Sequence, residues 1–183
     1  MKQLVGVLSQ FNIYGYASIV PADTYKKAFP GCGEHDPLFL AATQTIHNMV
    51  QLAHNAKADV SMWFEGSDVY PAIARIYNKV RESKQPGAFR MKGISGATKE
   101  LRPLQAADLV AREAFKHSDN FGIRPVRKPV KELADYLYFI RWTDKALQYL
   151  ADYGGPENHE LLLKWDTIPE APRLEMFIKR NFK

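Results

Sequence analysis

The sequence predicts an α/β protein in which helices pack on the faces of a sheet. Strand-like and helix-like patterns alternate along the first two thirds of the chain, the order typical of that class. The 183 residues suit one main core, and 46% hydrophobic with 25% charged residues is the composition of a folded protein. We expect an α/β core over residues 1–122 and a C-terminal helical extension over 123–183.

Three strands are predicted from runs of β-branched and aromatic residues, over 13–20, 60–65 and 89–94. In the second of them apolar and other side chains alternate, as in a strand with two covered faces, and Glu65 stands at its carboxyl end. The turn that follows contains Asp68, which we interpret as the cap of the next helix.

Helices are expected over 36–56, 70–80 and 103–117. The first begins at Asp36, whose carboxylate can accept hydrogen bonds from free amides and is followed by a proline preset for the first turn. The periodicity of this helix assigns His47 to its polar, solvent-facing side. The residues expected on its apolar face are Phe39, Ala42, Ile46, Met49, Val50 and Ala53.

The C-terminal third is rich in aromatic residues. Residues 130–151 are expected to be helical, with a second helix restarting at Thr143, and 161–183 to form an apolar arm. Aromatic side chains can stack on bases, but a stripe at helical spacing more often belongs to a core or to an oligomer contact. A homodimer through these C-terminal helices is therefore expected.

The charge and the cysteine content limit which partners and which cellular compartment are expected. The net charge of +5 and the pI of about 9.2 permit nucleic acid as a partner without requiring it. The most basic stretch, 124–131, is either a solvated linker or a tract that follows phosphates. The single cysteine, Cys32, has no intramolecular disulfide partner, and no apolar run is long enough to span a bilayer. We expect a cytoplasmic protein.

Two carboxylates stand out as candidates for chemistry. Asp108 falls in the same helical stripe as Leu104, Ala111 and Phe115, which predicts a carboxylate on the packed face of its helix. A buried charge is kept there only beside a cation, a metal or hydrogen-bond donors, because an unpaired one costs several kcal/mol. The alternatives are that Asp108 pairs with Arg112 or Lys99 and that Glu65 only ends its strand.

Together these two acids suggest a metal site. Ligands of open α/β sheets gather beyond the carboxyl ends of the strands, where Glu65 is expected, and the helix of Asp108 could pack across that edge. Converging carboxylates are the ligands that Mg²⁺ or Mn²⁺ prefers. We expect Glu65 and Asp108 to approach each other closely enough to share a cation.

Three stretches carry a family resemblance: Phe64-Glu65-Gly66, the loop 95–99 and the run Pro103-Leu104-Gln105-Ala106-Ala107-Asp108-Leu109. They resemble the family known as domain of unknown function 3800, which is regarded as ribonuclease-H-like, and the resemblance covers about 13–117. It implies a ribonuclease-H-like mixed sheet flanked by helices, with Glu65 and Asp108 in an acidic metal site. The family completes that site with an Asp-Glu-Ser-Gly motif on its first strand, which this sequence lacks. We therefore expect an N-terminally truncated version of the fold.

The leading expectation for function is a nuclease or phosphodiesterase in which Glu65 and Asp108 are the catalytic, metal-binding residues for Mg²⁺ or Mn²⁺. Two carboxylates are few for this chemistry, so weak metal binding is expected. The rivals are an inactive interaction module that uses the aromatic C-terminal helices, and a nucleic-acid binder without chemistry. The basic residues expected to contact nucleic acid are Lys99, Arg124, Arg127, Lys128 and Lys131.

Overall fold

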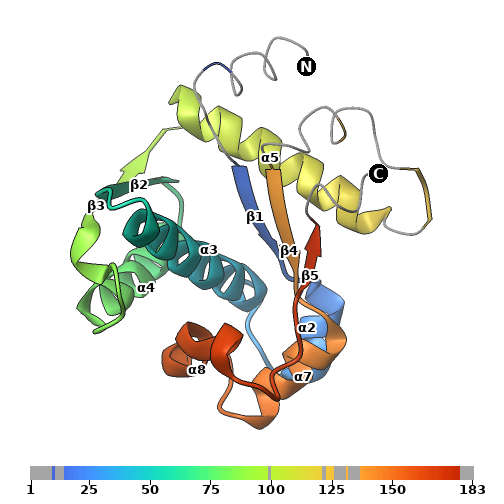
Figure 1. The fold of residues 1–183 in the computed structure, drawn as a ribbon. Helices are drawn as coiled ribbons and strands as arrows, with labels where there is room; N and C mark the ends of the chain where they lie inside the picture. Colours follow the sequence, from blue (N-terminus) through green and yellow to red (C-terminus); the bar gives the residue numbers. More distant parts are fainter. Residues whose placement is uncertain are drawn as a thin grey trace.

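The computed structural model confirms an α/β protein in which helices and strands alternate along the chain (Figure 1). Within its described residues the chain forms helices and short strands arranged in two sheets. None of the described helices is long and apolar enough to cross a membrane. The structure describes residues 10, 15–98, 100–120, 123–125, 131 and 137–177.

The strands form two sheets, where the sequence led us to expect one. In the first sheet, β1 (Gly15–Ile19) pairs in parallel with β4 (Leu137–Arg141), and β5 (Glu175–Phe177) lies antiparallel on the other side of β4. In the second, β2 (Val60–Glu65) pairs in parallel with β3 (Met91–Ala97). Parallel pairing needs crossover connections, and the helices that follow β1 and β2 along the chain supply them.

Two long helices sandwich the first sheet. A side chain at Gly15 of β1 would meet Val110 of α5, whereas the next residue, Tyr16, is hydrogen-bonded to Asn48 of α3. Because successive residues of a strand point to opposite faces, α3 and α5 cover opposite faces of the sheet. Both helices also contact β2 and so join the two sheets. The described α-helices are α2 (Ala22–Ala28), α3 (Asp36–Asn55), α4 (Tyr70–Glu82), α5 (Arg102–Asp119), α7 (Asp144–Asp152) and α8 (His159–Lys164).

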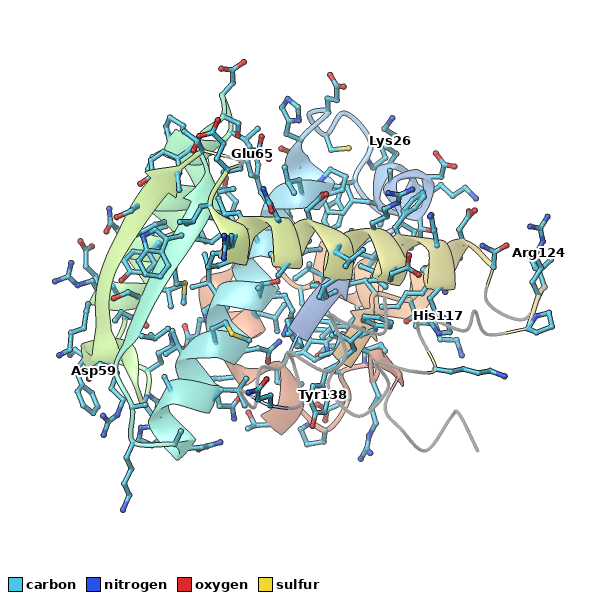
Figure 2. The ribbon with its side chains drawn as sticks, turned by 90° about the horizontal axis from the view of Figure 1, so that it is seen from above. Lys26, Asp59, Glu65, His117, Arg124 and Tyr138 are labelled. Carbon is cyan, nitrogen blue, oxygen red and sulfur yellow. The ribbon has the colours of Figure 1, made fainter. Side chains whose placement is uncertain are left out.

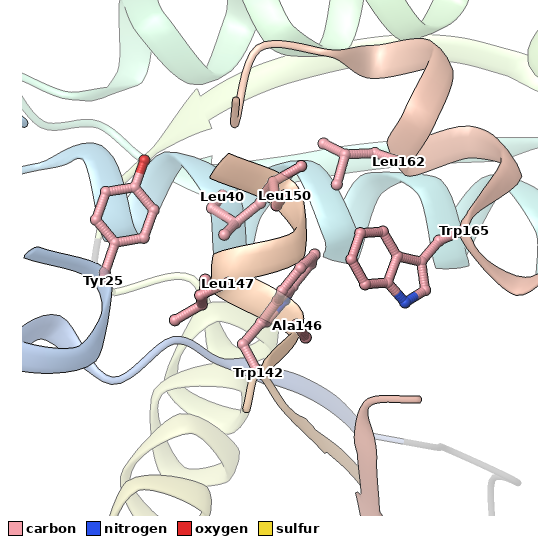
Figure 3. Packing of buried hydrophobic residues seen from close by; sticks show 8 residues of the cluster. All are labelled: Tyr25, Leu40, Trp142, Ala146, Leu147, Leu150, Leu162 and Trp165. Atoms are coloured by element: carbon pink, nitrogen blue, oxygen red, sulfur yellow. The ribbon is translucent and has the colours of Figure 1, made fainter. Parts of the chain in front are cut away.

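The apolar side chains form two clusters, and α3 contributes to both. Leu40 belongs to the first cluster, which lies between α2, α3, α7 and α8 (Figure 3), and Ile46 and Val50 belong to the second. The first cluster is Tyr25, Leu40, Trp142, Ala146, Leu147, Leu150, Leu162 and Trp165. The second is Ala42, Ile46, Val50, Met62, Ile73, Tyr77, Val80 and Met91.

Packing on two sides corrects the expectation for His47. Its exposed fraction is 8%, so it lies inside the protein and not on the solvent face to which helical periodicity assigned it. Thr43, one turn earlier, is likewise buried and donates a hydrogen bond of 2.8 Å to the carbonyl oxygen of Phe39. A helix covered by a sheet on one side and by a second cluster on the other buries more than one stripe.

The helical structure expected over 130–151 is wrong at 137–141, which forms β4. Leu137 and Phe139 are each 2% exposed, because β4 has a strand on either side and α5 above it. The predicted restart at Thr143 is confirmed, since its Oγ1 accepts a hydrogen bond of 3.1 Å from the amide of Ala146 and caps α7. The segment beyond residue 122 thus shares a sheet with β1 and is not a purely helical extension.

Candidate functional site

Glu65 ends β2, as the sequence predicted, and its side chain is exposed. It stands opposite Ala97, the last residue of β3, and the amide of Gly66 donates a hydrogen bond of 2.8 Å to the carbonyl oxygen of Ala97. This bond holds the two parallel strands together where they end. Figure 2 shows Glu65 at the end of the sheet from which the chain enters α5.

Asp108 lies on α5, but on the side of the helix that faces solvent. The predicted packed stripe is therefore wrong: Asp108 and Ala111 are exposed, and Phe115 is 66% exposed. A different stripe faces the first sheet, because the close contact between Val110 and Gly15 sets the rotation of the helix. The buried residues of α5 are Glu113, Ala114 and His117.

The structure brings the elements of the two acids together, but its described part shows no metal centre. α5 contacts β2, so the helix of Asp108 packs against the strand that ends at Glu65. Among the described residues, however, no three His, Cys, Asp or Glu side chains are grouped to hold a metal ion. Magnesium keeps several waters and is held by one or two carboxylates together with substrate phosphates, so two exposed carboxylates without a substrate bind it weakly. Among the described residues, Glu65 and Asp108 thus supply only part of the ligand set of a Mg²⁺ or Mn²⁺ site.

The predicted capping role of Asp68 is also wrong. α4 begins at Tyr70, its N-cap residue is Val69, and no side chain caps it. Asp68 is exposed in the turn between Glu65 and the helix, close in sequence to the acidic end of β2. Its carboxylate therefore does not cap the helix, contrary to the prediction from its position in the sequence.

The buried polar residues of α5 were not among the site residues expected from the sequence. Glu113 is 3% exposed and His117 is 6% exposed, one turn apart on the face that meets the first sheet. The His117 ring lies against Phe139 of β4, with 5.8 Å between ring centroids, and burial lowers the pKa of His117. The sequence signal for Glu113 and His117 was their spacing from Val110 and Ala114, because these four residues form one helical stripe.

A basic concavity lies at the C-terminal end of α5. Lys116, Asn120, Arg124 and Pro125 line a cavity of about 410 Å³. The side-chain amide of Asn120 donates a hydrogen bond of 2.7 Å to the carbonyl oxygen of Lys116, and the amide of Arg124 donates one of 3.0 Å to the carbonyl oxygen of Asn120. These bonds fix the turn that carries Arg124 beyond the helix. Positive charge is favourable there, because the C-terminal end of a helix carries negative partial charge.

The other basic residues proposed from sequence are only partly described. Lys131 is exposed, as expected for a phosphate-binding side chain. Lys99, Arg127 and Lys128 lie outside the described residues. The basic concavity and the acidic end of β2 sit at opposite ends of α5 (Figure 2). An 18-residue helix measures about 27 Å at a rise of 1.5 Å per residue, so the two sites cannot share one phosphate group.

Comparison of the chain with protein-family models gives no match. Comparison with curated proteins gives none either. No solved structure matches the chain. The resemblance to domain of unknown function 3800 thus rests on the quoted motifs alone, and the function must be argued from the residues of this chain and their geometry.

Proposed function

We propose that the chain is a ribonuclease-H-like domain that binds the phosphate backbone of nucleic acid and, with the groups described, cleaves it little or not at all. The observation that carries the proposal is the basic concavity at the C-terminal end of α5. There Lys116 and Arg124 flank one hollow, and a tight hydrogen-bonded turn fixes the backbone of Arg124. Nucleic-acid binding without sequence preference rests on this kind of phosphate contact.

The shape of the hollow and its two cations suit a phosphate, and these cations also offset the negative partial charge of the helix end. Arg124 is exposed and Lys116 is partly exposed, so both cations can reach a ligand that enters the hollow. The net charge of +5 attracts a polyanion to the molecule as a whole. Guanidinium and ammonium groups bind phosphate oxygens through charge-assisted hydrogen bonds, the strong class of hydrogen bond.

The order of elements supports the ribonuclease-H-like assignment. From β1 to α5 the chain forms a strand, a short helix, a long helix, a parallel pair of strands joined by a helix, and then α5. The run Leu104-Gln105-Ala106-Ala107-Asp108-Leu109, which carries the family resemblance, lies in the first half of α5 and so in the helix that packs against β2. In this proposal Glu65 and Asp108 are two members of an acidic site that needs further ligands.

A second candidate function is metal-dependent cleavage by Glu65 and Asp108. The contact between β2 and α5 favours it, since both acids are exposed on these two touching elements. The shortage of ligands argues against it, because phosphoryl chemistry with two metals uses bridging and flanking carboxylates to hold the ions about 4 Å apart. Binding without efficient cleavage is the function that the described residues support better.

Replacing both Lys116 and Arg124 by glutamine is expected to weaken binding to a fluorescein-labelled oligonucleotide about tenfold or more in moderate salt. The plot of log affinity against log salt concentration should become shallower by about two units, because each cation lost removes about one phosphate contact. Fluorescence anisotropy over a salt series measures both quantities on single-stranded and duplex probes.

The matched control is the pair Arg81→Gln and Lys84→Gln. These side chains are exposed at the end of α4 and just after it, so the same two charges are lost away from the concavity. Equal losses of affinity in the two double variants would show that only net charge matters. The proposed site would then be wrong.

Incubation of the protein with labelled RNA, duplex DNA or hybrids and Mn²⁺ is expected to give little or no cleavage. Millimolar Mn²⁺ should raise the Tm only modestly, because two exposed carboxylates bind a cation weakly. Asp108→Asn should abolish that rise, whereas Asp119→Asn, an exposed residue at the other end of α5, should leave it unchanged. Strong cleavage that disappears in Glu65→Gln and in Asp108→Asn would instead establish the second candidate function.

A further inference from the structure

A second cavity, of about 410 Å³, lies between α2, α3, α4 and the turn at 156–157. We call it the α2–α4 cavity. Its size is within the range of pockets that hold small organic molecules. Apolar side chains such as Phe39 and Ile76 line it, and Tyr25 of α2 forms part of its wall. It involves neither Glu65 and Asp108 nor the basic concavity.

Tyr25 gives this cavity a polar group in need of a partner. The residue is wholly buried, at 0% exposed, and among the described residues its hydroxyl has no hydrogen-bond partner. Figure 3 shows the hydroxyl turned away from Trp142 and Leu147, the centre of the cluster to which the ring belongs. A buried hydroxyl without a partner costs about 1–3 kcal/mol. A ligand in the cavity is one source of that partner.

The charged residues of the cavity have opposite signs on its two sides. Asp36 and Glu157 line it near Tyr25, and burial followed by the charge of Asp36 raises the pKa of the Tyr25 hydroxyl. Arg75 and Lys79 line it from α4, where they are one helical turn apart. In the structure neither cation forms an ion pair with a described residue. One wall thus suits a positive group and the other suits a negative group.

We propose that the α2–α4 cavity binds a small zwitterion with an apolar body, of the size and chemistry of an apolar amino acid. Its ammonium group lies towards Asp36 and Glu157 and donates to the Tyr25 hydroxyl oxygen. Its carboxylate lies towards Arg75 and Lys79. The apolar body packs on the side chains between them. The site is independent of nucleic-acid binding and is tested separately.

Titration of the full chain with the apolar L-amino acids tests the proposal, with binding measured by calorimetry and by the shift in Tm. For L-phenylalanine the two half-ligands are phenethylamine, which lacks the carboxylate, and hydrocinnamate, which lacks the ammonium group. At least one apolar amino acid is expected to bind about tenfold more tightly than its half-ligands, since each half loses one set of charged contacts.

Three variants locate the site. Arg75→Gln and Tyr25→Phe should each weaken binding of that amino acid about tenfold, whereas Arg81→Gln, on the same helix but outside the cavity, should not. Tyr25→Phe should not lower the Tm of the free protein, because it removes a hydroxyl that has no partner. The proposal is overturned if no apolar amino acid binds, if the half-ligands bind equally well, or if Arg75→Gln and Tyr25→Phe bind like the wild type.

Discussion

Replacing Trp142 by alanine is expected to lower the free energy of unfolding by about 3–5 kcal/mol, a large part of the stability of a domain of this size. Trp142 is wholly buried where β4 leads into α7, and its ring contacts Trp165, with 5.1 Å between centroids. The backbone amide of Trp142 donates a hydrogen bond of 2.9 Å to the carbonyl oxygen of Ile19, and this bond ties the end of β4 to the end of β1. Alanine leaves a cavity that this packed cluster cannot close.

Urea denaturation of Trp142→Ala and of Trp63→Ala measures the difference. Trp63, on β2, is 54% exposed, so its removal deletes the same side chain with little loss of packing. We expect less than about 1 kcal/mol for that control. Comparable losses in both variants would show that the cluster around Trp142 does not hold the C-terminal segment on β1.

Gly87→Ala is expected to cost about 2–5 kcal/mol, the sum of backbone strain and steric clash. Gly87 has a φ of +92°, and a Cβ there would lie 2.8 Å from the carbonyl oxygen of Val50 and 2.8 Å from the Cβ of His54. Both neighbours belong to α3 and cannot move without distorting that helix. The turn into β3 therefore packs against α3 at a distance that only glycine allows.

Gly31→Ala separates the two contributions to this cost. Gly31 has a φ of +86°, almost the same as Gly87, but among the described residues no atom beyond its two chain neighbours lies within 4 Å of the Cβ position. Its replacement should cost only about 1–2 kcal/mol, the price of a left-handed backbone for alanine. Thermal and urea denaturation of both variants give the comparison, and equal effects would mean that α3 yields at Gly87.

Where neighbouring residues decide the structure, the sequence was a reliable guide. α3 begins at Asp36 as predicted, and alternation over 60–65 predicted the full length of β2. The predicted capping role of Asp36 is wrong, because its carboxylate accepts a hydrogen bond of 2.7 Å from the amide of Gly33 and no side chain caps α3. The helix over 103–117 exists with nearly the expected ends, as Arg102–Asp119. These features depend on contacts within one turn or one strand, which a single sequence displays directly.

The surroundings of the predicted site residues were harder to predict from the sequence. Glu65 is at the predicted strand end, because that position follows from the strand itself. The surroundings of Asp108 depend on which stripe of α5 meets the sheet, and two stripes of that helix carry apolar residues. The contact of Val110 with Gly15 chose between them, and it joins residues almost a hundred positions apart.

The sequence by itself determined that this is an α/β protein, where most of its helices and strands lie, and that Glu65 ends a strand. Only the tertiary structure decided that 137–141 is a strand beside β1, that His47 is buried and that Asp108 faces solvent. The physical reason is the same in each case. An apolar run such as Tyr138-Phe139-Ile140 suits either a helix or a strand, and contacts with partners distant in sequence select one of them.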